Sequence, residues 1–182
     1  LWVLLPPSWD PMGDQSFLFG TDSLGRDVLS RLIYGARVAM TVAIVASIGA
    51  MILGTIAALL AGYFGGWVDM VISRTVDVWI SFPPVVLSLI LIVGLGVGLD
   101  KVILAIVLVD WTRFCRVLRA EVVLVRQQAY VSAARMVGQS HFVTLTREVL
   151  PAVVPLIITL LSLEMGIAVT VEAILSLVGM GV

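Results

Sequence analysis

The sequence has few charged residues, one cysteine and one histidine, and each shortage excludes a class of protein. Only 13% of the 182 residues are charged, against about 25% in soluble domains. The single cysteine, Cys115, excludes an internal disulfide framework and a cysteine-rich metal site. The single histidine, His141, leaves no histidine cluster for catalysis or metal binding. The sequence also has no Gly-rich, lysine-containing Walker motif, so we expect no ATP-hydrolysing site on it.

The remaining composition is strongly hydrophobic. Hydrophobic residues make up 60% of the chain, and the mean hydropathy is +1.14. In water such a surface would expose large apolar patches and aggregate, so the sequence predicts a membrane environment. About 20 apolar residues in a helix cross the roughly 30 Å hydrocarbon core of a bilayer. We therefore expect an all-α, polytopic membrane helical bundle with spans near 38–62, 70–97, 102–118 and 150–171.

Two local features refine these spans. The adjacent Pro83 and Pro84 should kink the second span, because proline removes a backbone donor and clashes with the preceding turn. Arginines concentrate in the segment 113–147, which the positive-inside rule predicts to be a cytoplasmic loop. The turn at 61–69 then lies on the same side, and residues 1–37 lie outside. The arginines of the segment are Arg113, Arg116, Arg119, Arg126, Arg135 and Arg147.

Residues 20–37 alternate in polarity with a helical period. Asp22 or Ser23 could cap the start of a helix, and Asp27 and Arg31, four residues apart, could form an ion pair on it. This pattern predicts an amphipathic interfacial helix. We divide the chain accordingly into an extracytoplasmic segment, 1–37, and a membrane core, 38–182.

The first predicted span carries a stripe of small residues with alternating spacings of four and three. Small side chains let helix backbones approach closely in lipid, so this helix-packing stripe should contact another helix. The alternative is that it lines a translocation pathway. Its members are Ala43, Ser47, Ala50, Gly54, Ala57 and Ala61.

Three acidic residues, Asp110, Glu164 and Glu172, lie within or near predicted spans. Acids at membrane depth usually face the bundle interior or a water-filled cavity. For Asp110 we expect an ion pair with Arg113 or with a neighbouring helix. Glu164 is either buried against a partner subunit or lines the substrate path. If Asp110 and Glu164 coupled protons instead, the protein would be a secondary transporter.

The polar segment 130–151 interrupts two apolar stretches. Helix-forming residues run from 121 to 137, Gly138 follows as a left-handed C-cap, and a second short helix is expected at 139–148, turning at Pro151 into the membrane. The segment 130–151 would thus form an elbow of two short helices joined at a glycine. Ala133 and Ala134 give this elbow a flat side on which a partner could dock. A solvated hairpin lying against the bilayer is the alternative.

The elbow resembles the EAA loop of ABC-importer permeases, in which Glu-Ala-Ala is followed at fixed spacings by Gly and by Ile-X-Leu-Pro. Ser132 stands where the motif has Glu, and Glu148 where it has Ile, so a salt bridge made by the motif's Glu is not expected in this chain. The resemblance implies an ATPase-coupling loop over 119–149. Its candidate residues are Ser132, Ala133, Ala134, Arg135, Gly138, Leu150 and Pro151.

Three further segments are similar to the C-type permeases of dipeptide, oligopeptide and nickel importers: "FGTDSLGRDVLSRLIYGAR" (19–37), "LAGYFGGWVD" (60–69) and "LSLVGMGV" (175–182). The resemblance implies the type I ABC importer permease fold, which has six spans. We therefore expect this sequence to hold spans two to five of a longer chain.

The same resemblance implies the function and the partners. It points to a non-enzymatic permease subunit in a bacterial plasma membrane that moves peptides, or alternatively nickel chelates, inward. A second permease subunit, two ABC ATPase subunits and an extracytoplasmic substrate-binding protein would accompany it. ATP would bind only the partner ATPases, and this chain would hold no cofactor or metal of its own.

Overall fold

The computed structural model describes residues 4–96 and 98–177, and within them the secondary structure is helical, with a single isolated bridge between Thr21 and Asp27. The all-α fold class is confirmed. The chain divides into two compact units, residues 1–41 and 42–182. The predicted motif segment 175–182 lies outside the described residues from position 178 onward.

In the first unit, a turn precedes α1 (Val28–Phe64). The predicted cap was wrong: Asp27 caps the helix, accepting hydrogen bonds from the backbone of Leu29 and Ser30 at 3.3 and 3.0 Å. Asp22 instead organises the turn, and Arg31 pairs with it at 2.5 Å rather than with Asp27. The pKa of Asp22 is held well below its usual value, mainly by the hydrogen bond from the backbone N–H of Arg26 and to a smaller extent by the side chains of Arg31 and Arg26.

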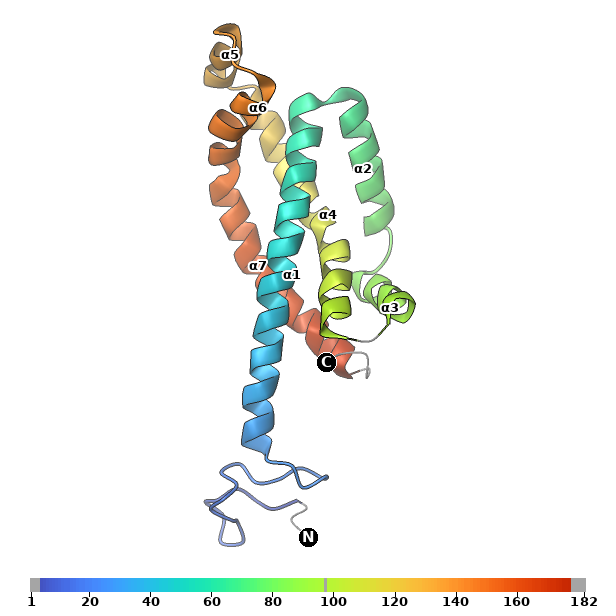
Figure 1. Ribbon diagram of the computed structural model, residues 1–182, viewed down its shortest axis with the longest axis vertical. Helices are drawn as coiled ribbons and strands as arrows, with labels where there is room; N and C mark the ends of the chain where they lie inside the picture. Colours follow the sequence, from blue (N-terminus) through green and yellow to red (C-terminus); the bar gives the residue numbers. More distant parts are fainter. Residues whose placement is uncertain (1–3, 97, 178–182) are drawn as a thin grey trace. The chain divides into compact units, whose positions relative to one another are not determined.

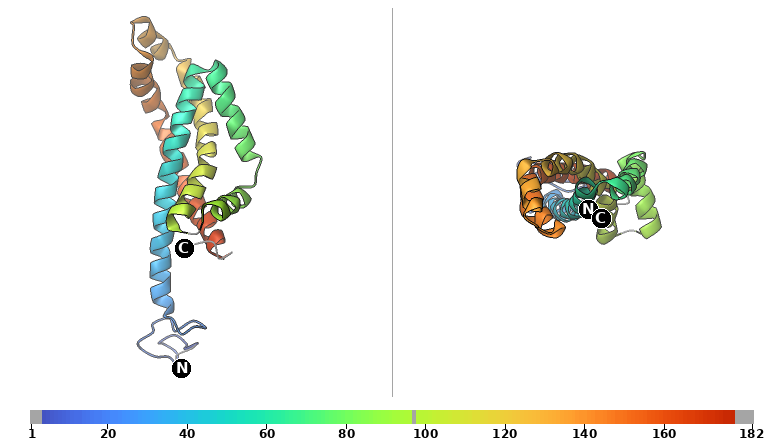
Figure 2. Two further views of the ribbon diagram at one scale, coloured as in Figure 1. Left: turned by 45° about the vertical axis from the view of Figure 1, so that its right-hand side comes forward. Right: turned by 90° about the horizontal axis from the view of Figure 1, so that it is seen from above.

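The second unit is built around three helices that lie side by side in Figures 1 and 2: α1, α4 (Leu99–Arg126) and α7 (Leu150–Leu177). Figure 2 shows α2 and α3 on one side of this group and α5 and α6 on the other. The main core comes mostly from these three helices. Its members include Ala50, Ala58, Phe114, Leu118, Val122, Val153 and Ile157.

The second predicted span is broken rather than kinked. It forms α2 (Gly66–Ile80) and α3 (Pro84–Leu95), whose axes differ by 92°. Pro83 has an extended ψ of 129°, because a following proline disfavours the helical conformation of the preceding residue. Two successive prolines therefore end one helix and start another.

The predicted bounds of the third span and of the loop after it were wrong. Helix α4 runs through Arg113, Arg116 and Arg119 to Arg126, so these arginines lie in a helix and not in a loop. Arginine is a good helix former, and acidic side chains on neighbouring helices balance three of these charges, as described below.

The elbow also differs from the prediction. A break at 127–128, where the sequence has neither glycine nor proline, separates α4 from α5 (Ala129–Met136). Beyond Gly138, α6 (His141–Thr144) continues through a π-helical turn, η1 (Leu145–Val149), directly into α7 without turning at Pro151. The widened turn precedes Pro151, where a regular helix would press the proline ring against the carbonyl four residues back.

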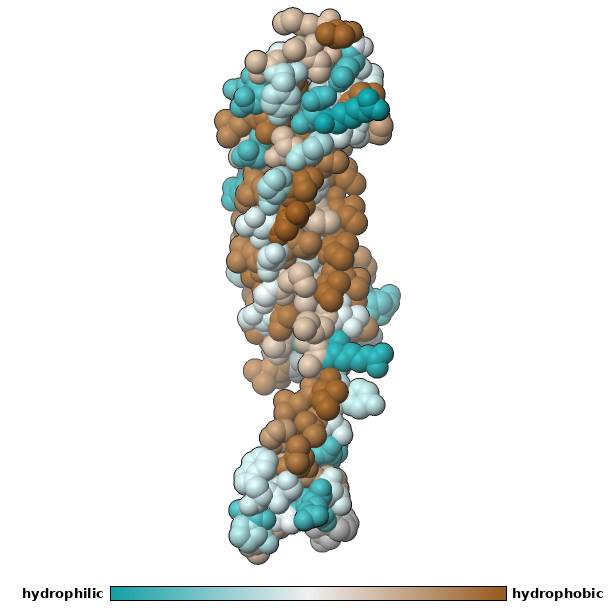
Figure 3. All heavy atoms as spheres, turned by 90° about the vertical axis from the view of Figure 1, so that its left-hand side faces the viewer, coloured by the Kyte–Doolittle hydropathy of each residue, from teal (hydrophilic) through white to brown (hydrophobic). Residues whose placement is uncertain are grey.

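Among the described residues, two continuous helical stretches are long and apolar enough to cross a membrane, Val28–Phe64 and His141–Leu177, and the bent pair α2–α3 could form a third span. The predicted third span is not among them, because α4 carries several charges within its length. Figure 3 shows hydrophobic side chains over the middle of the second unit, and hydrophilic ones gather at the end that carries α5 and α6.

Candidate functional site

The small residues of α1 face α4. A Cβ added at Gly54 would lie 2.5 Å from the carbonyl oxygen of Trp111 and 3.0 Å from the amide nitrogen of Cys115. No side chain fits there, so the two backbones are in close contact. All six residues of the helix-packing stripe are buried except Ala57, which is half-buried. Sequence analysis missed Ala46, Ala58 and Gly62, which are buried on the same helix.

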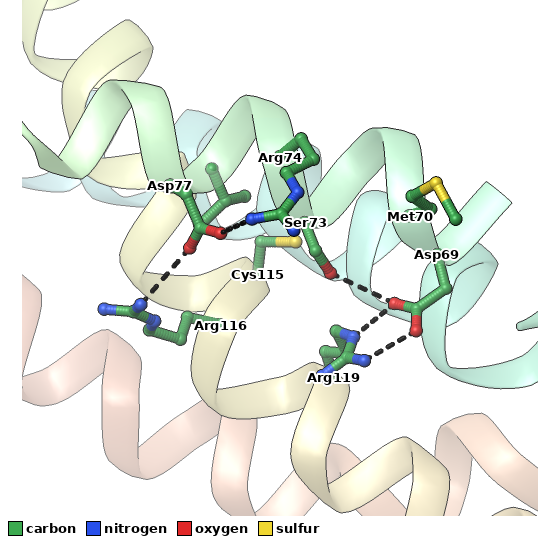
Figure 4. A pocket seen from close by; sticks show the side chains of 9 residues that line it. Asp69, Met70, Ser73, Arg74, Asp77, Cys115, Arg116 and Arg119 are labelled. Atoms are coloured by element: carbon green, nitrogen blue, oxygen red, sulfur yellow. Dashed lines mark hydrogen bonds and ion pairs between the residues drawn. The ribbon is translucent and has the colours of Figure 1, made fainter. Parts of the chain in front are cut away.

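Helix α2 is attached to α4 mainly by charged side chains (Figure 4). Arg119 donates through two nitrogens to the carboxylate of Asp69, one of these bonds being 2.6 Å. Arg116 approaches Asp77 at 3.4 Å. Val76 is the one residue of α2 that is buried. Beside these pairs a cavity of about 380 Å³ remains between the helices, lined in part by Ser73 and Cys115 of Figure 4.

A partly buried ion pair joins α4 to α7. Arg113 Nη1 donates to Glu164 Oε1 at 2.9 Å, and the Glu164 side chain is 2% exposed. The other oxygen of Glu164, Oε2, is buried without a hydrogen-bond partner. Asp110 is 5% exposed, and no hydrogen bond or ion pair of its carboxylate is found among the described residues. Two buried carboxylates thus share the neighbourhood of one arginine.

These positions correct the predictions for the acids. Arg113 pairs with Glu164, not with Asp110. Glu164 is buried within its own chain, so burial does not require a partner subunit. Glu172, the third acid, is buried on α7 at 7% exposure. The sequence showed which residues are acidic at membrane depth, but it could not show which acid Arg113 would meet.

The elbow is anchored to the end of α1 by hydrogen bonds. Arg135 Nη1 donates to the hydroxyl of Tyr63 at 2.9 Å and also contacts Nδ1 of the His141 ring. The rings of Tyr63 and His141 meet edge to face at 5.7 Å. Arg135, predicted in the coupling loop, therefore contacts α1. Sequence analysis missed Tyr63, and the aromatic pair Tyr63-Phe64 before the double glycine is the signal that could have indicated it.

Gly138 forms the bend between α5 and α6. Its φ of +94° lies in the region that favours glycine, so the predicted bend at a glycine is confirmed in its geometry. A Cβ added there would meet no atom within 4 Å. The requirement for glycine at this position is therefore conformational and does not come from crowding.

The outer side of the elbow is exposed and apolar. Met136, Val137 and Phe142 are 86%, 87% and 75% exposed. Ser132 and Ala133 are also exposed, and Ala134 is half-buried. At the base of the elbow, Leu150 is half-buried and Pro151 is exposed. Exposed apolar side chains, where they form a patch, are typical of an interaction site.

The comparison with protein families identifies one match. Residues 50–182 match the family described as "Binding-protein-dependent transport system inner membrane component". The match includes α2 to α7, the ion pairs on α4 and the elbow.

Individual relatives extend the similarity to 90% of the chain. It is 36% identical over 163 residues to a dipeptide transport system permease protein from Alkalihalophilus pseudofirmus. It is 34% identical over 162 residues to a glutathione transport system permease protein from Pectobacterium atrosepticum, and 35% identical over 163 residues to one from Shigella dysenteriae. The chain spans about half the length of these relatives, 54% in each case. The chain belongs to the family of inner membrane components of binding-protein-dependent transport systems.

Proposed function

We propose that this chain is the membrane-embedded part of a permease subunit in an ATP-driven importer, and that residues 119–149 couple it to separate ATPase subunits. Peptides or similar small solutes are the proposed cargo, since the relatives are named for dipeptide and glutathione transport. Nickel chelates remain a further candidate. A second permease subunit and an extracytoplasmic binding protein complete the proposed assembly. ATP would bind the partner ATPases.

The structure of the elbow supports this proposal. Its outer side exposes Met136, Val137 and Phe142 beside the small Ala133, which suits docking against another protein. Its inner side is fixed to the end of α1 by the Arg135–Tyr63 hydrogen bond. A docked surface with a firm connection to a membrane helix can pass a rigid-body movement from one subunit to the next.

The test places a charge on the exposed face. Ala133→Glu adds a carboxylate that contact with a partner would bury without a counter-charge, which costs several kcal/mol. In the complete transporter we expect weaker ATPase association and a joint loss of uptake and substrate-stimulated ATP hydrolysis. Gln15→Glu, which adds the same charge at an exposed residue far outside the coupling region, is the matched control. Normal association and uptake in Ala133→Glu would show that this face is a solvated surface.

The bend can be tested separately. Gly138→Val places a β-branched residue at φ +94°, which costs about 1–2 kcal/mol and redirects α6. Gly138→Asn tolerates positive φ better and serves as the control. We expect Val to reduce uptake and ATP hydrolysis together and Asn to preserve most of both. Equal uptake in the two variants would contradict the role of the bend.

The alternative function, proton-coupled secondary transport, is favoured by one observation, the two buried acids Asp110 and Glu164. A carboxylate that carries protons must change its protonation state, whereas a structural partner of Arg113 need not. Under the ATP-driven proposal, Glu164→Gln retains most uptake. Loss of uptake with normal ATPase assembly, together with a response to a collapsed pH gradient, would favour the proton-coupled carrier.

A further inference from the structure

A second cavity, of about 260 Å³, lies where the broken α2–α3 segment passes α4. Trp79 and Phe82 line it from the end of α2 and the break, and Asp110, Arg113 and Arg116 line it from α4. Interrupted helices at membrane depth are tolerated where they are buried in protein or line a cavity. The break between α2 and α3 beside this cavity is therefore consistent with a binding site.

Asp110 supplies the observation that points to a ligand. Its side chain lines this cavity and is only 5% exposed. No hydrogen bond or ion pair of its carboxylate is found in the described part of the chain. Burying a carboxylate without a partner is costly, and the nearest candidate, Arg113, is committed to Glu164. An ammonium group in the cavity would supply the missing donor.

The same helix also brings positive charge to the cavity, at Arg113 and Arg116. Arg113 uses Nη1 for Glu164, which leaves other N–H donors of its guanidinium group. The ion pair between Arg116 and Asp77 is long, at 3.4 Å, and the Arg116 side chain is 59% exposed. Both arginines can therefore donate to a carboxylate. Trp79, whose indole N–H donates to the carbonyl of Leu108, offers its ring to an organic cation.

The spacing of these charges limits the length of the ligand. At a rise of 1.5 Å per residue, Arg113 and Arg116 lie about 4.5 and 9 Å along α4 from Asp110. An extended dipeptide reaches roughly 7 Å, which falls between the two. A cavity of 260 Å³ is slightly below the range of about 300–1,000 Å³ for small-molecule sites, so it suits a small solute or one end of a longer one.

We propose that this cavity binds a small zwitterionic solute of the dipeptide class, with Asp110 accepting from its ammonium group and Arg113 and Arg116 donating to its carboxylate. The inference rests on the proposed transport function and adds a binding cavity and its contact residues to it. A zwitterionic lipid headgroup, phosphatidylethanolamine, has related chemistry, and the experiment distinguishes the two sources.

The experiment measures binding to the full-length protein in nanodiscs without ATP, by equilibrium dialysis. The probes are alanylalanine, N-acetylalanylalanine, which lacks the ammonium group, and alanylalanine amide, which lacks the carboxylate. Hydrogen bonds to charged groups imply that the parent protein prefers alanylalanine over each analogue by roughly 10- to 100-fold. Asp110→Asn should abolish only the preference over the acetylated analogue. Arg116→Gln should weaken only the preference over the amide.

Glu172→Gln, at a buried acid of α7 that does not line the cavity, should change neither preference. Asp110→Asn is nearly isosteric and removes an unpaired charge, so a melting temperature at or above that of the parent verifies its fold. Absence of alanylalanine binding in the parent, or an unchanged preference in Asp110→Asn, overturns the proposal. Loss of alanylalanine binding when phosphatidylethanolamine is included in the nanodiscs also overturns it and assigns the cavity to lipid.

This readout is independent of the coupling test. If Ala133→Glu uncouples ATP hydrolysis while Asp110→Asn leaves the preferences intact, the transport function stands and the cavity assignment fails. If the preferences behave as expected but no ATPase associates with the protein, the ATP-driven function fails instead.

Discussion

Helix α4 contacts α1 and α2 in two different ways. Toward α1 the contact is made by small residues, and at Gly54 there is no room even for a methyl group. Toward α2 the contact is made by two arginine–carboxylate pairs, a tryptophan hydrogen bond and one buried side chain, Val76. The first interface is closely packed. The second is polar and has a cavity beside it.

The difference indicates which helix can move. Close packing of backbones has one good arrangement and loses contacts on any displacement. Partly exposed ion pairs stabilise little and can re-form in a shifted position. We therefore expect α1 and α4 to move as one body, and α2 to be the element that separates from α4 most readily.

The largest expected effect comes from Gly54→Leu. The new side chain must displace the α4 backbone near Trp111, so we expect a loss of about 3 kcal/mol or more of stability, with failure to assemble. Gly166→Leu on α7 is the matched control, because a Cβ there meets nothing within 4 Å. Thermal unfolding of the two purified variants measures the difference. Equal melting temperatures would mean that the α1–α4 contact is not close.

The next effect is an asymmetry at the α4–α7 ion pair. Arg113→Gln leaves the buried Glu164 without its partner, at a cost of about 2–4 kcal/mol. Glu164→Gln leaves an arginine that is 37% exposed and can reach water or headgroups, so we expect a loss below about 1 kcal/mol. The two melting temperatures give the comparison. Equal losses would show that the burial of Glu164 does not decide the outcome.

A smaller effect is expected at the α2–α4 interface. Asp69 and Arg119 are 24% and 36% exposed, so a double-mutant cycle with Asp69→Asn and Arg119→Gln should give a coupling energy of about 0.5–1 kcal/mol. A coupling energy of 3 kcal/mol or more, the upper end for contacting residues, would make this interface as firm as the α1–α4 contact and would remove the distinction between them.

The smallest effect is expected in the first unit, at Asp22. Its carboxylate accepts hydrogen bonds from the backbone of Leu24 and Arg26, and its pKa is lowered. The stability that Asp22 contributes through its lowered pKa is present above the unfolded pKa near 3.8. It is lost only as the pH falls through the lowered pKa of the folded state. Asp22→Asn at neutral pH should therefore speed amide exchange at Leu24 and Arg26 without affecting residues 42–64. Unchanged exchange at both amides would contradict the role of Asp22.

The sequence predicted features that depend on local chemistry. Hydropathy predicted the helical class, the two prolines predicted the disruption after α2, and Gly138 predicted the bend in the elbow. Each is a property of a few adjacent residues. The resemblance of residues 19–37 and 130–151 to ABC-importer permeases predicted the family.

The sequence did not predict features that depend on contacts between distant residues. Arg116 and Arg119 were interpreted as loop charges, because nothing near them in the chain shows that Asp77 and Asp69 lie opposite. The continuation of α6 into α7 depends on a π-helical turn that has no simple sequence signal. The anchoring of Arg135 by Tyr63, 72 positions earlier, likewise appears only in the folded chain.

Hydrogen exchange in the full-length protein tests the central claim most directly. Amides of α2 (Gly66–Ile80) and of α1 from residue 42 onward would be compared in nanodiscs, for the parent and for Asp69→Asn. We predict that α2 exchanges at least about tenfold faster than α1, and that Asp69→Asn accelerates α2 alone. Equal exchange in the two helices, or acceleration of both by Asp69→Asn, would contradict the distinction between a fixed α1–α4 pair and a separable α2.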